Sequence, residues 1–170
     1  MNLRLATISD LPQIIKMYKK IVAKMYDNNI YIWDEIYPCK YFEKDIKNNQ
    51  LYLLINNNEI ISAFALCHLK NTAKGVNWMD KNAKALYIER LGVNINYLRN
   101  GIGYTAVNKA IVLAGQMNAE YLRLFVVDNN YAAINLYQKA GFKKADGIYE
   151  EVIDYDLTLH ELGFEIKIKS

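Results

Sequence analysis

Apolar residues in the first part of the chain recur at helical spacing. Side chains three and four positions apart are apolar, which is the pattern of a helix with one buried face. Ser9 precedes this stretch as a candidate N-cap, Asp10 falls in the first turn, and Pro12 is tolerated there. We therefore predict a short strand over 2–7 and then a helix over about residues 10–26. The apolar positions of this helix are Leu11, Ile14, Ile15, Tyr18, Ile21, Val22 and Met25.

After an irregular connection and a second predicted helix, the pattern becomes that of β-strands. Two β-rich runs flank the turn Asn56-Asn57-Asn58, which is typical of a hairpin. In chain order we predict an irregular aromatic-rich connection over 27–37, a helix over 38–48, hairpin strands over 51–55 and 59–69, a polar loop over 70–84 and a strand over 85–93.

The second half of the chain alternates between helix and strand. After Gly103 apolar residues return to helical spacing as far as Met117. A strand over 121–127, a short helix over 131–140 stopped by Gly141, and two strands near 145–152 and 156–169 follow. Antiparallel strands followed by a strand-helix-strand crossover predict an α/β fold of mixed α+β type. Its mostly antiparallel central sheet has helices on both faces.

Length and composition fit a single domain over residues 1–170. A chain of 170 residues buries about 70% of its unfolded surface. The net charge of +3 is too mild to indicate a nucleic acid or membrane partner. Cys39 and Cys67 lack metal-ligand spacing, so we expect no metal. The sparse cysteines, and an N-terminus that resembles neither signal peptide nor anchor, favour a cytoplasmic protein.

The turn Gly101-Ile102-Gly103 carries the chemistry, because a helix begins just after it. Glycine permits positive φ and lets backbone amides approach a ligand closely. The start of a helix adds unpaired N–H donors and the positive end of the helix dipole. Together these features favour binding of a phosphate or pyrophosphate. Taken alone, the same turn is equally consistent with a tight structural connection.

A dinucleotide site is a second interpretation of this turn. Residues 101–106 satisfy the pattern G-x-G-x-x-A. However, the preceding strand ends near Val93, which leaves a long loop, and antiparallel strands come before it. Asp128 follows Gly101 by 27 residues, whereas the fingerprint expects an acid after about 20. Dinucleotide binding, as in an oxidoreductase, is therefore a minor alternative.

Two motifs resemble those of the GNAT acetyltransferases. Residues 88–93 and 98–103, IERLGV and LRNGIG, resemble the acetyl-CoA motif Q/R-x-x-G-x-G/A that follows a strand. Residues 130–142, NYAAINLYQKAGF, match the family pattern N-x-x-A-x-x-L-Y-x-K-x-G-F at every fixed position. The resemblance covers residues 85–145 firmly. One departure is Leu98, which stands where the family has Gln or Arg, while Arg99 is adjacent.

The resemblance implies how acetyl-CoA would bind. A splayed strand pair would hold the pantetheine arm, with bonds to backbone near Leu91 and Val93. Backbone amides of 99–104 would bind the pyrophosphate, with or without the missing side chain. The implied acetyl-CoA-binding residues are Leu91, Gly92, Val93, Leu98, Arg99, Asn100, Gly101, Ile102, Gly103, Tyr104, Asn130, Ala133 and Tyr137.

The reaction implied is direct attack of a primary amine on the thioester in a ternary complex. Tyr137 is the candidate general acid, because a phenol with a pKa near 10 can donate a proton at neutral pH. Glu89 is the candidate base, and strand alternation would place it on one face with Tyr87 and Leu91. An ion pair for Glu89 and simple packing for Tyr137 are the alternative roles.

The acceptor is not specified by the sequence. Tyr31, Trp33 and Glu35 fall in the region where this family builds its acceptor site, and Tyr87 would line the site as well. A GNAT-like domain that senses acyl-CoA without catalysis is the main alternative function. The alternating strand at the C-terminal end could pair with a second copy, which would give a homodimer.

Overall fold

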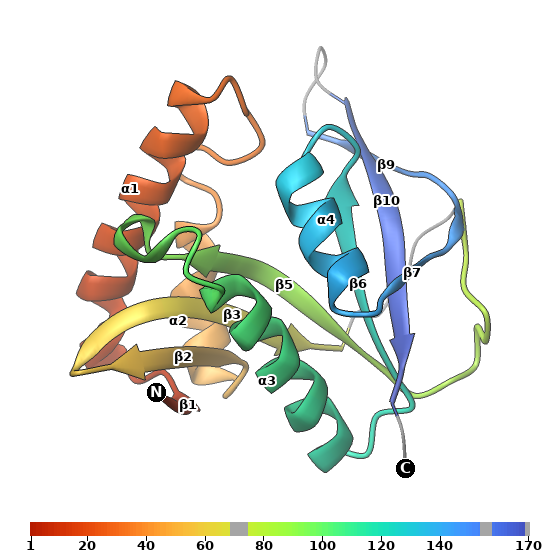
Figure 1. Ribbon diagram of the computed structural model, residues 1–170, viewed down its shortest axis with the longest axis horizontal. Coiled ribbons are helices and arrows are strands. Elements are labelled where there is room, and N and C mark those ends of the chain that lie inside the picture. Colours follow the sequence, from red (N-terminus) through yellow and green to blue (C-terminus); the bar gives the residue numbers. More distant parts are fainter. Residues whose placement is uncertain (69–74, 154–157, 169–170) are drawn as a thin grey trace. The chain divides into compact units, whose positions relative to one another are not determined.

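The computed structural model describes residues 1–68, 75–153 and 158–168 of the chain. The predicted loop over 70–84 and the last predicted strand therefore lie partly outside the described residues. The described residues form two compact units. Unit 1 comprises residues 1–66 and 89–109, and unit 2 comprises residues 67–88 and 110–170. Strand β5 (Ala85–Val93) and helix α3 (Ile102–Gln116) contribute to both units (Figure 1).

Unit 1 contains the predicted hairpin. Strands β1 (Asn2–Leu5), β2 (Leu51–Asn56) and β3 (Glu59–Cys67) pair antiparallel in that order. The end of β5 lies next to β3. Asn57 and Asn58 form the hairpin turn with φ of 46° and 63°. Asparagine tolerates this left-handed region better than most residues, which explains the Asn-rich turn.

Helices α1 and α2 pack against the strands of unit 1. Helix α1 (Leu11–Asp27) buries a stripe that packs with α2 (Cys39–Lys47) and with Leu51, Leu53 and Ala63. Ser9 was predicted to cap α1, but it lies inside a 3₁₀ turn, Ile8–Asp10. The carboxylate of Asp10 accepts a hydrogen bond from the amide of Thr7 at 2.7 Å instead.

Tyr18 joins α1 to two strands at the centre of unit 1. Its side chain is fully buried, and its hydroxyl donates to the carbonyls of Ala63 at 3.1 Å and Arg90 at 2.5 Å. Arg90 has a φ of 55°, so β5 is irregular at this residue. A Cβ on Gly92 would come within 2.7 Å of the Tyr18 ring. Glycine at 92 is therefore required by close packing against the tyrosine.

Unit 2 contains the parallel strand pair and most of the second half of the chain. The start of β5 pairs parallel with β6 (Tyr121–Val127), and this ladder joins Ala85–Tyr87 to Tyr121–Arg123. Strand β6 pairs antiparallel with β10 (Thr158–Lys167). Unit 2 also contains α4 (Tyr131–Lys139), β7 (Lys143–Lys144) and β9 (Tyr149–Val152), and both of these strands pair with β10.

Two short strands, β7 and a strand inside the predicted loop over 70–84, were missed by the sequence analysis. Strand β4 (Val76–Asn77), inside the predicted loop, pairs with β8 (Asp146–Gly147). Gly147, with a φ of 92°, also ends β8, so the strand predicted near 145–152 is divided. A Cβ on Gly147 would lie 1.9 Å from the carbonyl oxygen of Gly75. The pairing thus depends on two glycines far apart in sequence.

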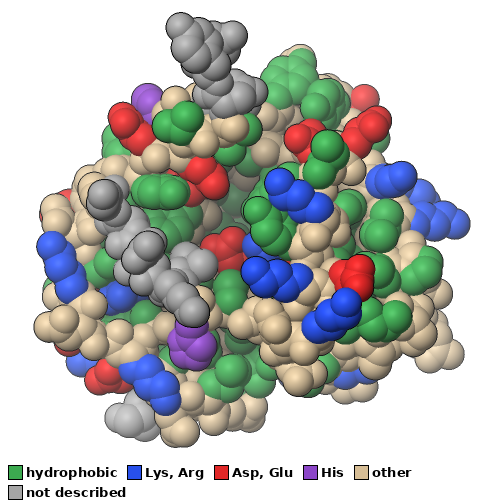
Figure 2. Space-filling view, turned by 180° about the vertical axis from the view of Figure 1, so that it is seen from behind, with side chains coloured by type: hydrophobic (Ala, Val, Ile, Leu, Met, Phe, Trp, Pro, Cys, Tyr) green, Lys and Arg blue, Asp and Glu red, His purple; other side chains and the backbone are tan. Residues whose placement is uncertain are grey.

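The predicted fold class is confirmed: a mixed, mostly antiparallel sheet is flanked by helices. None of the helices within the described residues is long and apolar enough to span a membrane. Basic, acidic and apolar side chains are interspersed on the face drawn in Figure 2, as a small net charge allows.

Replacing Tyr18 with Phe is expected to destabilise the protein by about 1–3 kcal/mol, because two buried carbonyls lose a hydrogen-bond donor. Urea unfolding measures the change. Tyr26→Phe is the matched control, since Tyr26 lies on the same helix with an exposed side chain. Equal stability of the two variants would contradict a structural role for the Tyr18 hydroxyl.

Candidate functional site

The glycine turn lies between a short 3₁₀ helix and the start of α3, all within unit 1. The 3₁₀ helix η2 (Ile95–Tyr97) is capped by Asn94, whose side-chain oxygen accepts from the amide of Asn96 at 3.1 Å. Gly101 has a φ of 73°, as the sequence predicted for a glycine turn. A Cβ at Gly101 would meet nothing within 4 Å, so backbone conformation and not space favours glycine here.

The amides of this turn are available to a ligand. Arg99, with a φ of 63°, Asn100 and Gly101 donate no backbone hydrogen bond within unit 1, and all three are exposed. Helix α3 begins at Ile102, so its first amides have no intrahelical acceptor. Leu98 is also exposed and has extended backbone. The turn therefore offers N–H donors and a helix dipole to an anion.

Backbone groups at and just after the end of β5 are hydrogen-bonded to residues of β3. The carbonyl of Gly92 accepts from the Ser62 hydroxyl at 2.7 Å, and the amide of Asn94 donates to the carbonyl of Ile61 at 2.9 Å. Alternate residues of a strand direct their N–H and C=O groups to opposite sides. The backbone groups of Leu91 and Val93 therefore point away from β3, where a ligand could use them.

Glu89 takes part in a charged cluster beside this strand. The Arg90 guanidinium lies 3.3 Å from the Glu89 carboxylate and 3.0 Å from that of Asp45. It also packs over the Tyr41 ring, 5.2 Å from the ring centroid. Burial raises the pKa of Asp45, and the positive charge of Arg90 acts in the opposite direction. Asp45, a polar residue on the buried face of α2, was not identified from the sequence.

The alternation predicted for Tyr87, Glu89 and Leu91 is interrupted at Arg90. A residue with positive φ inside a strand changes the direction of the side chains around it, as in a β-bulge. Glu89 is thus held beside Arg90, its neighbour in sequence, and the alternative role of an ion-paired carboxylate is present in the structure.

Tyr87 lies in an aromatic cluster of unit 2. Its ring stacks on Phe125 at 6.1 Å and meets the edge of Trp78 at 6.1 Å. The side chains of Tyr87 and Trp78 are almost entirely buried, and neither the hydroxyl nor the indole N–H has a hydrogen-bond partner among the described residues. The cluster with Ala85, Ala145 and Tyr149 makes Tyr87 a core residue of this unit.

The second predicted motif forms helix α4 of unit 2. The Asn130 side chain caps this helix by accepting from the amide of Ala133 at 3.3 Å. Tyr137 is buried, and its ring lies 5.9 Å from that of Phe142. The amide of Phe142 donates to the carbonyl of Tyr137 at 3.0 Å. The motif therefore has a clear structural role, which binding residues within it would share.

The three acceptor candidates of unit 1 differ in their surroundings. Trp33 is half-buried against Tyr18, with ring centroids 5.6 Å apart. Tyr31 is exposed, packs its ring against Tyr26, and donates its hydroxyl to Asn29 at 3.1 Å. Glu35 is exposed. Within unit 1, Trp33 and β5 thus share Tyr18, which packs against the Trp33 ring and donates to the Arg90 carbonyl.

Comparisons with known proteins bear on the family and the fold. Residues 14–142 match the model of the acetyltransferase (GNAT) family. The Drosophila melanogaster protein named Probable N-acetyltransferase san is 29% identical over 136 residues, which cover 79% of this chain. They cover 66% of that relative, so the chain spans just under two thirds of its length.

Solved structures show the same fold. A GNAT-family acetyltransferase from Streptococcus agalactiae has a TM-score of 0.81 and 18% identity, and covers 99% of this chain and 95% of its own. A protein from Salmonella typhimurium, solved with its cofactor acetyl-CoA, has a TM-score of 0.69 and 14% identity. The match covers 99% of this chain and 94% of that protein.

Replacing Arg90 with Met is expected to destabilise the protein by about 3–5 kcal/mol at neutral pH, because Asp45 remains buried without its partner. The pKa of Asp45 then rises further above its unfolded value. Protons are bound preferentially by the folded state in this range, so the loss should shrink as pH falls through the folded pKa of Asp45. Denaturant unfolding at pH 5 and pH 7.5 measures the difference.

The double variant Arg90→Met with Asp45→Asn is the control. It should recover most of the loss at neutral pH, since no buried charge is left unpaired at position 45. A loss of equal size at both pH values, and in the double variant, would mean that Arg90 stabilises the protein through packing alone.

Proposed function

Because the chain belongs to the acetyltransferase (GNAT) family, we propose that it moves an acetyl group from acetyl-CoA to a primary amine. The observation that carries the proposal is the turn before α3, which is exposed at residues 99–101 and whose amides there donate no backbone hydrogen bond within unit 1. Residues 1–170 would then act as one acetyltransferase domain.

The pyrophosphate of acetyl-CoA would bind to the backbone of residues 98–104. Leu98 cannot donate a side-chain hydrogen bond, so the amides of Arg99, Asn100, Gly101, Ile102 and Gly103 carry this interaction, with Tyr104 at its end. The exposed guanidinium of Arg99 would add charge from an adjacent position. The Salmonella typhimurium structure with acetyl-CoA, on the same fold, supports this choice of ligand.

The pantetheine arm would follow the end of β5. The backbone groups of Leu91 and Val93 point away from β3 and can bond to the amides of the arm. Gly92, which packs against Tyr18, would be required for the position of this strand. As the family resemblance implies, Asn130 and Tyr137 would lie near the thioester, and Ala133 would be a further cofactor-binding residue of the same motif.

The proposed reaction is a single transfer. The nitrogen of a neutral amine attacks the thioester carbonyl carbon, the new C–N bond forms, and the C–S bond then breaks. The leaving sulfur receives a proton from the Tyr137 hydroxyl, and Glu89 removes a proton from the attacking nitrogen, directly or through water. An N–H of the β5 backbone would stabilise the oxygen that becomes negative.

Arg90 has two effects on Glu89 as a base. It fixes the carboxylate in place through a contact of 3.3 Å, and it partly neutralises the charge that attracts a proton. Asp45 competes for the same guanidinium at 3.0 Å and is more deeply buried than Glu89. Because Asp45 shares the guanidinium, Arg90 neutralises less of the negative charge on Glu89 than it would in an isolated Arg90–Glu89 pair.

The acceptor would be an amine that is cationic before it loses its proton. Trp33 and Tyr31 offer aromatic rings and Glu35 offers a carboxylate, a combination that attracts ammonium groups. Tyr87 is a less suitable contact residue than the sequence suggested, because its side chain is buried within unit 2.

Replacing Gly101 with Val is expected to weaken binding of CoA at least about tenfold, because a β-branched residue is strained at positive φ and the turn must deform. Calorimetric titration with CoA measures the affinity. Gly141→Val is the matched control, since Gly141 has a φ of 92° but lies after α4. Equal affinity in the two variants would contradict backbone binding at the turn.

Replacing Tyr137 with Phe is expected to lower kcat about 10²-fold or more, because the leaving sulfur loses its proton donor. The KM for acetyl-CoA should change little. The assay mixes protein, acetyl-CoA and a panel of primary amines and follows release of free thiol. Tyr131→Phe, on the exposed side of the same helix, is the control.

Three outcomes of this assay would contradict the proposal in different ways. Full activity of Tyr137→Phe would remove the acid role. Thermal stabilisation by CoA without thiol release from any amine would indicate a sensor of acyl-CoA. Stabilisation by NAD but not by CoA would indicate a dinucleotide site.

A further inference from the structure

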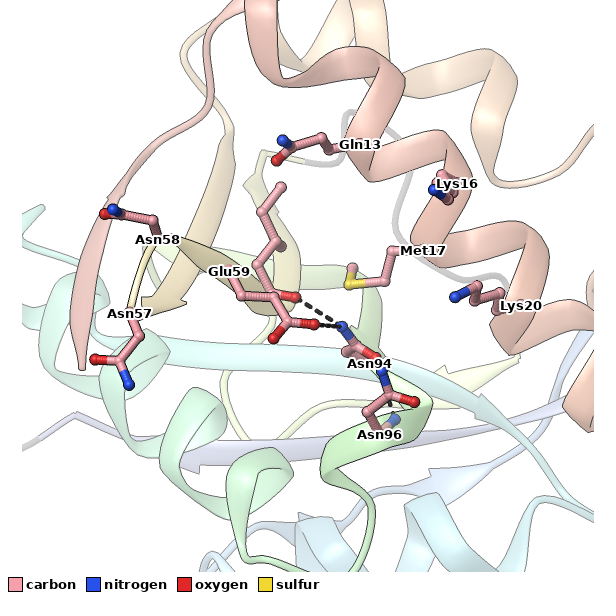
Figure 3. Close-up of a pocket in the computed structure, with 10 residues that line it drawn as sticks. Gln13, Lys16, Met17, Lys20, Asn57, Asn58, Glu59, Asn94 and Asn96 are labelled. Carbon is pink, nitrogen blue, oxygen red and sulfur yellow. Dashed lines mark hydrogen bonds between the residues drawn. The ribbon is translucent and has the colours of Figure 1, made fainter.

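A hollow of about 330 Å³ opens on unit 1 (Figure 3). Its walls come from α1, from the turn between β2 and β3, and from residues 94–96 after β5. The turn residues 98–104 do not line it. The hollow is therefore separate from the backbone amides that are proposed to bind acetyl-CoA.

The floor of the hollow is fixed by Asn94, which is buried. Its side-chain N–H groups donate to the Ile60 carbonyl at 3.0 Å and to the Glu59 carboxylate at 3.2 Å. Its side-chain oxygen accepts from the amide of Asn96 at 3.1 Å. Because all three bonds are made before a ligand arrives, this floor costs little to order on binding.

Glu59 is the one carboxylate among the lining residues, and its two oxygens are bonded to Asn94 in the floor and to Tyr97, which does not line the hollow. One oxygen accepts from Asn94 and the other accepts from the Tyr97 hydroxyl at 2.6 Å. This hydrogen bond also raises the pKa of Tyr97. These two hydrogen bonds fill part of the acceptor capacity of the carboxylate, so less of it is left for a cationic ligand.

The opposite wall presents hydrogen-bond donors along one stripe of α1. Gln13, Lys16 and Lys20 are spaced by three and four residues and so lie on the same side of the helix. Figure 3 shows them along one side of the hollow, with Asn57 and Asn58 on the other. None of these five side chains makes a hydrogen bond or ion pair within the described residues.

The two lysines stand at i and i+4 on α1, where like charges repel each other and destabilise the helix. An anion between them would relieve this repulsion and gain two charge-assisted hydrogen bonds. Against one occupied carboxylate, the lining carries two ammonium groups, so its net charge is positive. The volume is within the range of sites for small metabolites, about 300–1,000 Å³.

We infer that this hollow binds a small anionic metabolite through an oxyanion group, a phosphate or a carboxylate, held by Lys16 and Lys20. The amide side chains of Gln13, Asn57, Asn58 and Asn96 would bond to the polar remainder of the molecule. This site is independent of acetyl transfer, and its ligand need not be a substrate.

The test is an NMR titration of the isotope-labelled protein with inorganic phosphate and, separately, with citrate, in the presence of saturating CoA. Shifts of the backbone and side-chain amides of Asn57, Asn58 and Asn96 are expected with at least one anion. Putrescine, a small cation, should cause no shift there. The anion with the higher affinity identifies the group that the site prefers.

The double variant Lys16→Gln with Lys20→Gln should weaken anion binding at least about tenfold, because the charged donors are lost. Lys19→Gln is the matched control, since Lys19 is exposed on α1 but does not line the hollow. All three lysines are exposed, so folding should be unaffected.

Three results would overturn the inference: no shift with either anion, shifts confined to residues 99–104, or equal affinity in the double variant and the wild type. If CoA itself does not bind, the proposed function fails. The titration without CoA still reports on this hollow, because its amides are distinct from those of the turn.

Discussion

One buried hydroxyl constrains the functional half of unit 1. Tyr18 donates to carbonyls of two strands, and the one in β5 belongs to Arg90, which has a positive φ. An arginine with this backbone conformation is disfavoured unless its surroundings compensate for it. The hydroxyl and the paired Asp45 supply that compensation from two different helices, α1 and α2. The irregularity in β5 is thus built by residues remote in sequence.

The consequences follow along the chain from this irregular residue. Glu89 is drawn beside the guanidinium of its neighbour, and Gly92 must lack a Cβ to pack against the tyrosine ring. Since Ser62 then fixes the Gly92 carbonyl, the backbone of Leu91 and Val93 is turned away from β3. A stability requirement and the binding role proposed for Leu91 and Val93 therefore act on the same few residues, so Tyr18 would influence the proposed chemistry without touching it.

Local signals predicted the elements whose cause is local. The stripe of α1, the Asn-rich hairpin turn and the positive φ of Gly101 each follow from neighbouring residues, and each is present. The 130–142 motif correctly indicated the family. The positive φ of Arg90, the pairing of β4 with β8 and the burial of Asp45 depend on contacts across the sequence. Periodicity cannot report such contacts, so the side-chain alternation inferred for Glu89 was too simple.

The same distinction applies to charge. The small net charge counted from the sequence excludes few classes of function. The fold, in contrast, separates buried, paired charges from exposed, unpaired ones. Arg90 and Asp45 are buried and paired, so they hold β5 in place and have little freedom to recruit a ligand. Lys16 and Lys20 are exposed and unpaired within the described residues, so their charge is available to a ligand. Electrostatic complementarity with ligands therefore has to be sought in the unpaired charges, even where the paired ones lie nearer the chemistry.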